Sequence, residues 1–582
     1  MRTSIKSIAV LLLCSLFIAP SFTSCEMLEE ETYGSPTVED MMANEDNVIL
    51  LVGQAYADIK WLHDHWGYWG VASLTSDECL CPIRVPGEHW ADGYYWKNLN
   101  THNWNSFADA FKNIWNSTIS GAVLCNKLIN TLEMSKDNMD PAVYAQYVGE
   151  LEILRSYYYY MLFECFGRIP YLEVFEDVTE PLMEPQCVWA YLVACVERNA
   201  PNLPQVSDAT RGTNYGRVTQ GFAYTLLARL YLNAESYGCS VESLNKNYNK
   251  GKETIKPADI LAAQKIEIKS ASDFYTNAVR CCDEVINSGS YSIESDYFEN
   301  FKILNENSRE NIFVIVEDGN ASFDLRYNGS MMNKLRMIQL TLHYCHQDAW
   351  NMTEKPWNGF CARPTFMDLF NPDDVRGPGN EGLGTECVHQ WGWFVGPIKD
   401  KEGKQLRDEN DSAAVIVPTV TSLDKASWND GARLWKYEVD KTKKYDWGEN
   451  DFVLMRYADV LWMKEEAILR GGVGASGFNS PDFITLRKRA FAYSDDPLAA
   501  YSKAYPNALS LDGILSERGR EFSWECIRRR DLIRFGQYGK IEYVTADDEY
   551  RNWFPIPYSV LEKGKRDEQG NPIWTQNDGY AY

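Results

Sequence analysis

The chain has 582 residues, 45% hydrophobic and 24% charged, and its 82 acidic and 57 basic residues give a net charge of −25. This length predicts several domain equivalents and a large buried core. Nucleic-acid binding needs clustered cations, so the charge argues against a nucleic-acid partner and against direct electrostatic binding to an anionic membrane. Aromatic residues make up 13% of the chain, an excess that is typical of recognition surfaces.

The first 25 residues are typical of an exported lipoprotein. Arg2 and Lys6 form a basic start, and residues 8–19 form an apolar stretch that is too short to span a bilayer stably. The small residues before Cys25 resemble a bacterial lipobox, although Phe22 stands where that motif usually has leucine. We therefore expect a signal peptide over 1–24, lipidation at Cys25 and a tether over 25–45.

An acidic run, EMLEEE, follows Cys25 directly. It resembles the surface-export signal of Bacteroidetes lipoproteins. The expected location is therefore the outer face of the outer membrane, with the protein held there by its N-terminal lipid anchor.

Apolar residues at three- and four-residue spacing predict a long amphipathic helix over 103–133 and a second one that begins at Asp140-Pro141. Further helices are predicted at about 46–60, 187–199, 217–236, 272–288, 452–470, 481–490 and 513–535. Consecutive helix pairs are typical of an α-solenoid. Segments 62–102 and 296–450 lack helical periodicity, and loops of that length are usually functional. We expect a mainly α fold with a helical scaffold over about 46–61, 103–295 and 451–540 and loop-rich binding insertions between these parts.

Seven segments in a fixed order carry a family resemblance. They are LRSYYYYMLFECFGRIPYL at 154–172, RVTQGFAYTLLARLYLNAE at 217–235, DFYTNAVRCCDEVINSGSYSI at 273–293, RENIFVIVED at 309–318, VLMRYADVLWMKEEAILRGG at 453–472, SERGREFSWECIRRRDLIRFG at 516–536, and NWFPIPYSVLEKG with NPIWTQNDGY at the end. Behind a lipobox, this set resembles the SusD/RagB family of surface nutrient-binding lipoproteins.

The resemblance implies a tetratricopeptide-like helical scaffold packed against a loop-rich ligand-binding half, with residues 46–582 as one SusD-like domain. It also implies non-catalytic capture of an oligosaccharide and delivery to a SusC-like TonB-dependent transporter, over which the lipoprotein lies as a lid. Some family members capture another nutrient, such as a peptide, so that alternative stays open. Two further alternatives are a helical glycoside hydrolase and a peptide-binding helical-repeat adaptor.

The Arg-rich segment 516–536 is predicted to be a structural helix, because its arginines alternate with carboxylates, as in the i,i+4 pair of Glu525 and Arg529. Asp77 and Glu78 form the best local carboxylate pair. Adjacent residues seldom point at one substrate, however, and the family resemblance implies a scaffold turn at 75–78.

No catalytic or cofactor-binding motif is found, so we expect no enzyme activity and no cofactor. His63 and His65 lack a third metal ligand. The structural calcium that some family members carry stays open, since there is no EF-hand-like loop.

Aromatic residues gather in the irregular segments, and an aromatic ring can stack on the C–H face of a pyranose while polar neighbours bond its hydroxyls. Four clusters stand out: residues 89–104; Tyr344, Trp350 and Trp357 with Asn351 and Asn358; Trp391 and Trp393; and WLHDHWGYWG at 61–70. The predicted ligand-binding residues are Trp90, Tyr94, Tyr95, Trp96, Asn98, Trp350, Trp391 and Trp393. We expect Trp96 to be an exposed stacking ring with Asn98 as its polar partner. Any single ring is more often buried in a core, and Trp104 is expected to be so.

Overall fold

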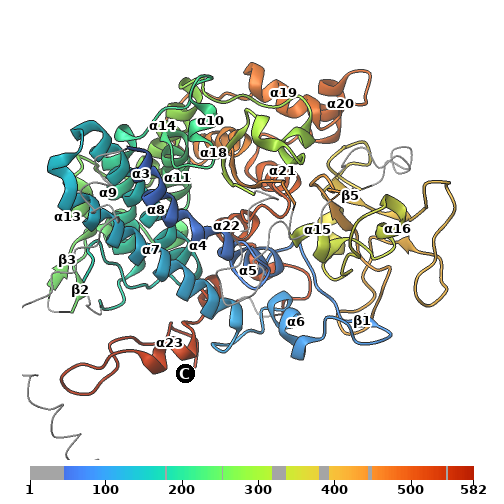
Figure 1. Ribbon diagram of the computed structural model, residues 1–582, viewed down its shortest axis with the longest axis horizontal. Helices are drawn as coiled ribbons and strands as arrows, with labels where there is room; N and C mark the ends of the chain where they lie inside the picture. The colour runs from blue at the N-terminus through green and yellow to red at the C-terminus, as the bar shows by residue number, and fades with distance from the viewer. Residues whose placement is uncertain are drawn as a thin grey trace, which may run out of the picture.

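The computed structural model describes residues 45–176, 180–251, 253–317, 336–378, 392–442, 448–545 and 548–581. Within these ranges the protein is mainly helical, with helix pairs on one side and short strands and loops on the other (Figure 1). The predicted signal peptide, Cys25 and almost all of the tether lie outside the described residues, as does Trp391. None of the described helices combines the length and the apolar character that crossing a membrane requires.

The helical half is built on two long neighbouring helices, α7 (Asp109–Ser135) and α8 (Pro141–Phe166). The side chain of Asp140 accepts a hydrogen bond from the amide of Ala142 (2.8 Å), which caps α8 where the sequence predicted its start. A Cβ atom added at Gly121 of α7 would lie 2.4 Å from the ring of Tyr158 in α8. Glycine therefore lets the two helices approach closely.

Further helices stack on this pair, since α8 packs against α9, α9 against α11, α11 against α14 and α14 against α18 (Figure 1). The other helices of this half are α3 (Glu45–Gly53), α4 (Ala57–Leu62), α9 (Pro185–Asn199), α10 (Arg211–Asn214), α11 (Gln220–Leu232), α12 (Val241–Leu244), α13 (Pro257–Ala262), α14 (Ala271–Asn287), α18 (Tyr457–Leu469), α19 (Pro481–Arg489), α20 (Pro497–Ala504), α21 (Leu511–Glu521) and α22 (Arg528–Arg534). A short hairpin, β2 (Tyr248–Lys250) and β3 (Glu253–Ile255), lies beside them. The predicted helical-repeat scaffold is confirmed.

The second half consists of short elements joined by long loops. Its helices are α5 (Tyr68–Leu74), α6 (Tyr95–Asn100), α15 (Arg336–Thr341), α16 (His346–Trp350) and α17 (Pro364–Met367). Its strands pair two by two: β1 (Arg84–Val85) with β8 (Ala426–Ser427), β5 (Gly392–Phe394) with β9 (Arg433–Trp435), and β6 (Gly396–Pro397) with β7 (Val415–Ile416). Segment 62–102 is therefore less irregular than predicted. The last helix, α23 (Tyr558–Lys563), lies near the C-terminus.

The helix predicted over 452–470 begins as a strand. Residues Phe452–Arg456 form β10, which pairs antiparallel with β4 (Asn311–Ile315), and α18 begins only at Tyr457. All five residues of β10 are buried. A short apolar run of this kind is compatible with either a strand or a helix, and here the partner strand decides.

The helix predicted over 513–535 is broken into α21 and α22. Between them the backbone takes left-handed conformations at Trp524 (φ 60°) and Cys526 (φ 64°). The Trp524 amide donates to Glu78 (2.9 Å), and its carbonyl accepts from the indole of Trp69 (3.0 Å). These tertiary hydrogen bonds replace the helical ones, so the predicted pairing of Glu525 with Arg529 within one helix is wrong.

A buried set of charged residues joins the two halves of the molecule. We call it the ion-pair network; its members are Glu310, Arg376, Lys436, Arg456, Arg489, Glu521 and Glu525, all at most 4% exposed. Arg456 contacts Glu310 (2.6 Å) and Glu521 (2.9 Å), and its second terminal nitrogen contacts Glu525 (2.8 Å). The Arg-rich segment is thus structural, as predicted, but its partners come from distant parts of the chain.

Both halves supply members of the network. Arg376 and Lys436 come from the loop-rich half and bind Glu521 (2.9 Å) and Glu525, respectively. Burial alone would raise the pKa of Glu521, but Arg489, Arg456 and Arg376 hold it well below its ordinary value. The carboxylates therefore stay ionised, and each depends on its arginine partners.

We predict that Arg456→Ala destabilises the protein by at least about 3 kcal/mol, because it leaves buried carboxylates without their shared cation. Urea denaturation followed by circular dichroism measures the loss. The control is Arg309→Ala, which removes an exposed partner of Asp208 and should cost less than about 1 kcal/mol. Equal losses in the two variants would contradict the role of the network.

Candidate functional site

Trp96, the first choice for an exposed stacking ring, is only 1% exposed, so that prediction is wrong. It lies on the buried face of α6, and its indole nitrogen donates to Asp92 (2.6 Å). The imidazole of His65 stacks on it with ring centres 5.6 Å apart, and Phe360 meets it edge-on at 5.4 Å. The short helix turns Trp96 inward, which the sequence spacing did not reveal.

Three half-buried rings surround Trp96. Trp66 and Tyr95 lie 4.6 and 4.8 Å from its centre, and Trp90 lies 6.0 Å away. Together with Trp96, Trp357 and Phe360 they form a continuous set of rings that we call the aromatic cluster. Buried rings form its floor, while the half-buried ones keep part of their surface accessible.

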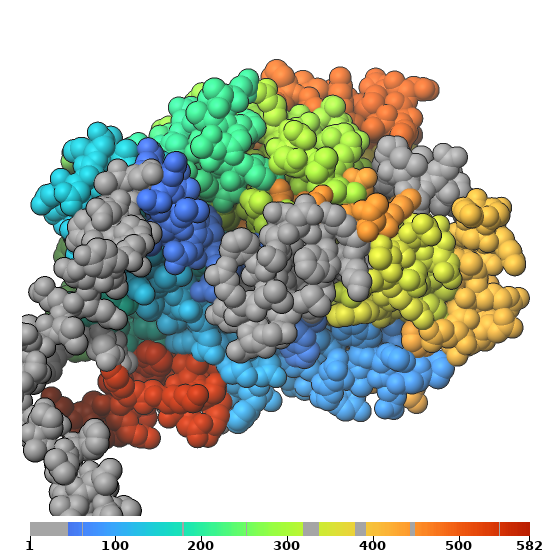
Figure 2. Space-filling view, in the orientation of Figure 1, coloured from blue at the N-terminus to red at the C-terminus, as the bar shows by residue number. Residues whose placement is uncertain are grey.

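Trp357 is the most exposed tryptophan of the cluster, at 41%. The indole nitrogen of Trp90 donates to the carbonyl of Trp357 (3.1 Å), and their ring centres are 6.1 Å apart. Two loops far apart in the sequence thus meet here, and Figure 2 shows the light-blue surface around residue 100 beneath the yellow surface around residue 350. An exposed indole face of this kind suits the C–H face of a sugar.

The loop that carries Trp90 is conformationally strained. Backbone φ is positive at Glu88 (50°), Trp90 (66°), Asp92 (36°) and Tyr94 (67°), a region that costs non-glycine residues about 1–3 kcal/mol each. A Cβ atom at Gly359 would lie 2.3 Å from the Trp90 ring, so the ring packs directly on that backbone. Such strain persists only where surrounding contacts enforce it, and it concentrates at functional sites.

Two buried arginines fix the loop that carries Trp357. Arg84 donates to the carbonyls of Gly359 (2.9 Å) and Ser427 (2.7 Å). Arg433 donates to the Asn358 side chain (2.8 Å) and to the carbonyl of Gly431 (2.7 Å). The two residues that follow Trp357 are therefore held by hydrogen bonds that reach across the loop-rich half, one at the Asn358 side chain and one at the Gly359 carbonyl.

Trp350 of the second predicted cluster and Trp393 of the third belong to the core, whereas Trp357 of the second is exposed and Trp391 lies outside the described residues. Trp350 is 5% exposed and stacks on Trp435 with ring centres 4.1 Å apart. Trp393 is 3% exposed on β5 and meets Trp524 edge-on at 5.6 Å. Both rings fill the interior between the strands and helices of the loop-rich half, so the prediction that they bind ligand from an exposed surface is wrong.

The remaining predicted residues lie at or near the aromatic cluster. Tyr94 is 57% exposed, with the ammonium of Lys97 5.5 Å from its ring centre. Tyr95 is half-buried, and its hydroxyl accepts from the amide of Ala110 (3.1 Å). Asn98 is half-buried on α6, two residues after the buried Trp96 rather than beside an exposed ring.

Trp66 and Trp357 were missing from the predicted site residues, and Trp104 is buried as expected. Both missed residues belong to aromatic-rich segments noticed in the sequence. A signal was available for Trp357, because it follows Pro356 in a segment without periodicity. Nothing in the sequence indicated that it would meet Trp90.

The other candidates for chemistry are structural. Both carboxylate oxygens of Asp77 bind Arg528 (2.7 Å), and Glu78 is fully buried behind Trp524. His63 bonds the Ile59 carbonyl (2.9 Å), and burial lowers its pKa to about 4. In the part of the chain that is described, no three His, Cys, Asp or Glu side chains are placed to hold a metal ion.

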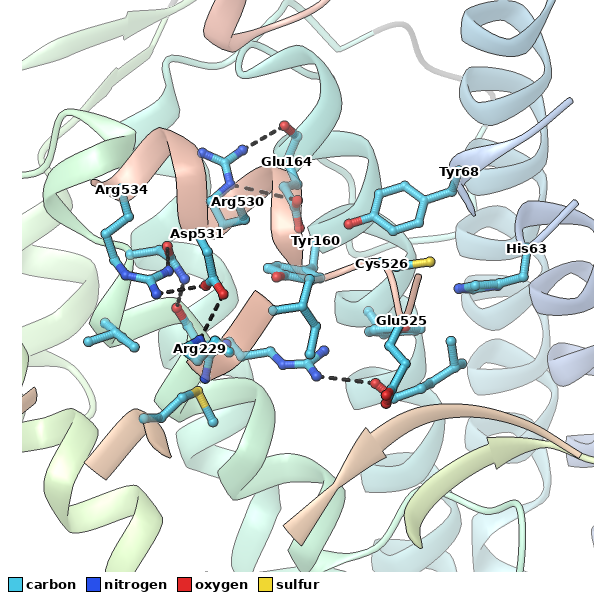
Figure 3. Close-up of a pocket in the computed structure, with 17 residues that line it drawn as sticks. His63, Tyr68, Tyr160, Glu164, Arg229, Glu525, Cys526, Arg530, Asp531 and Arg534 are labelled. Atoms are coloured by element: carbon cyan, nitrogen blue, oxygen red, sulfur yellow. Dashed lines mark hydrogen bonds and ion pairs between the residues drawn. The ribbon is translucent and has the colours of Figure 1, made fainter. Parts of the chain in front are cut away.

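Figure 3 shows a cavity inside the molecule that shares none of its lining residues with the aromatic cluster. Its volume of about 30 Å³ holds roughly two water molecules. Arg530 Nε and Glu164 Oε1 lie 3.7 Å apart in its lining, and neither atom has a hydrogen-bond partner among the described residues. The cavity is too small for a saccharide and suits buried water.

Fold and site together define a helical-repeat binding protein whose loops present an aromatic surface. Two family models match: the SusD family over residues 323–580, and a family described as starch-binding and associating with the outer membrane over residues 80–232. Over residues 323–580 the chain matches the SusD family, as its sequence resemblance predicted.

Individual relatives agree with this assignment. The chain is 23% identical to the starch-binding protein SusD of Bacteroides thetaiotaomicron over 471 residues, which are 74% of this chain and 72% of the relative. It shares its fold with surface glycan-binding protein A of Bacteroides fluxus (TM-score 0.65, 18% identity, 92% of this chain and 100% of that one). The Bacteroides thetaiotaomicron protein of the same name, solved with laminarihexaose, matches with a TM-score of 0.64 at 18% identity, over 91% of this chain and 99% of that one.

We predict that Trp96→Ala lowers the free energy of unfolding by about 3–5 kcal/mol, because it empties the centre of the aromatic cluster. Thermal denaturation of the purified protein measures the change. Tyr94→Ala, which removes an exposed neighbouring ring, is the control and should cost less than about 1 kcal/mol. A Trp96 variant as stable as the Tyr94 variant would contradict this assignment.

We also predict that Glu78 makes stability fall as pH rises. Burial raises the pKa of its carboxyl from 4.5 to about 8, so between these values the folded state holds a proton that the unfolded state releases. The free energy of unfolding therefore drops by up to ~1.4 kcal/mol per pH unit in this window. Glu78→Gln, a neutral match for the protonated acid, should remove this component in urea denaturation between pH 5 and 8. Parallel pH profiles in the two proteins would overturn the prediction.

Proposed function

We propose that the protein captures an oligosaccharide at the aromatic cluster without cleaving it, and delivers it to a SusC-like TonB-dependent transporter. In this proposal Cys25 carries the lipid that anchors the protein to the outer face of the outer membrane. The ligand stacks on Trp357 and on the accessible parts of Trp90 and Trp66, and neighbouring polar groups bond its hydroxyls.

One observation carries the proposal: Trp357 is 41% exposed in a loop that buried arginines hold rigid. A ring already fixed in its binding orientation loses little conformational entropy when a sugar stacks on it. The names of relatives support the ligand class, since one is a starch-binding protein and another was solved with laminarihexaose. The described carboxylates Asp77 and Glu78 do not flank the cluster as an acid and base pair would, because one is ion-paired and the other fully buried.

We predict that Trp357→Ala weakens oligosaccharide binding about fivefold to tenfold, the effect expected from losing one stacked ring. Isothermal titration calorimetry with maltohexaose and laminarihexaose measures the affinity. The melting temperature should change little, because the ring is partly exposed and the loop bonds described above do not use the Trp357 side chain. Tyr493→Ala, which removes a 62% exposed ring on the scaffold, is the matched control and should leave binding unchanged.

Two results would contradict the proposal. Equal affinity of the Trp357 variant and the unchanged protein would exclude the aromatic cluster as the binding surface. Sugar fragments released during prolonged incubation, in amounts exceeding the protein, would show an enzyme. A SusC-like transporter gene adjacent to this one would support the delivery step.

A further inference from the structure

A concave surface lies on the helical half, between α7 and the C-terminal segment that includes α23. Figure 1 labels both helices. We call it the α7–α23 groove. Its volume is about 520 Å³, a size typical of small-molecule sites. The groove shares none of its lining residues with the aromatic cluster.

The groove has an aromatic wall. Trp574 is half-buried and its ring meets that of the buried Trp115 at 5.8 Å. The indole nitrogen of Trp574 donates to the carbonyl of Glu180 (2.8 Å), which fixes the orientation of the ring. Asn116 and Ser120 of α7 place an amide and a hydroxyl on the exposed rim beside it.

The charge of the groove is opposite to that of the whole chain. Of its eleven lining residues, Lys112, Lys563 and Lys565 are basic and none is acidic, although the chain has a net charge of −25. Lys112 is paired with Asp109 (2.7 Å), which lies outside the lining. Lys563 is exposed in the last turn of α23. A ligand with negative charge is therefore favoured here more than over the acidic remainder of the surface.

We propose that the α7–α23 groove is a second saccharide site, one that selects sugars bearing carboxylate or sulfate groups. The ring of Trp574 stacks on the sugar face, Asn116 and Ser120 bond hydroxyls, and Lys563 attracts the acidic group. An acidic peptide would use the lysines equally well, but the fixed indole and the small polar rim favour a sugar. The proposal stands independently of the aromatic cluster.

The test uses Lys563→Glu and titrations with tetragalacturonate, neutral maltotetraose and a κ-carrageenan tetrasaccharide. We expect tetragalacturonate to bind the unchanged protein, less tightly at 300 mM than at 20 mM salt, and the variant to bind it about threefold to tenfold more weakly. Maltotetraose affinity should be the same in both proteins. The κ-carrageenan fragment carries sulfate but no carboxylate, so its binding would add sulfate to the accepted groups, and its absence would restrict the site to carboxylates.

Lys503→Glu is the matched control, since it reverses an exposed lysine in the last turn of another short helix, α20. It makes the same change in net charge and should alter tetragalacturonate affinity less than about twofold. An equal loss in both variants, or no binding of either acidic sugar, would overturn the proposal. So would tighter binding of a pentaglutamate peptide, which would indicate a protein partner.

Trp357→Ala separates this proposal from the proposed function. It should leave tetragalacturonate binding intact while weakening neutral oligosaccharides. If it instead abolishes binding of the acidic sugar, the α7–α23 groove is not the site, and the aromatic cluster binds both kinds of sugar.

Discussion

The fold depends on charges that are buried away from the solvent-accessible surface. Arg456 is held among Glu310, Glu521 and Glu525, and no member of the ion-pair network is more than 4% exposed. Bringing such groups out of water is costly unless each carboxylate keeps its cation, so the elements that carry them must dock together. Because Arg376 and Lys436 come from the loop-rich half, the packing of the scaffold and the placement of the loops depend on each other.

Buried arginines also position the candidate site. Arg84 and Arg433 have backbone carbonyls as their main partners. These carbonyls lie in loops or, at Ser427, in the two-residue strand β8, where little regular secondary structure is available to bond them. A guanidinium offers five hydrogen-bond donors in a rigid planar group, so one arginine side chain can hold several irregular segments together. The exposed ring of Trp357 is thereby attached to a rigid base, although it stands on a loop.

The many aromatic residues of the loop-rich half have two roles, and their burial separates the two. Trp96, Trp350 and Trp393 are core, whereas Trp66, Trp90 and Trp357 keep accessible surface above that core. In such a binding surface the buried rings and the accessible rings are of the same residue type. Composition alone therefore cannot tell which rings are buried and which can contact a ligand. In the helical half, the half-buried Trp574 likewise lies over a buried ring, that of Trp115. Lysines line the surface beside Trp574, whereas strained backbone lies beside Trp90.

The sequence by itself determined the helical scaffold, since apolar spacing and caps such as Asp140 are local signals that tertiary contacts reinforced. It also carried the family resemblance, and the segments that carry it include Glu310, Arg456, Glu521 and Glu525 of the ion-pair network. The tertiary structure decided that Phe452–Arg456 pairs as a strand, that Trp524 interrupts a helix, and that Trp96 points inward. It alone decided that Trp90 meets Trp357, because contacts between residues 267 positions apart leave no periodic trace in the chain.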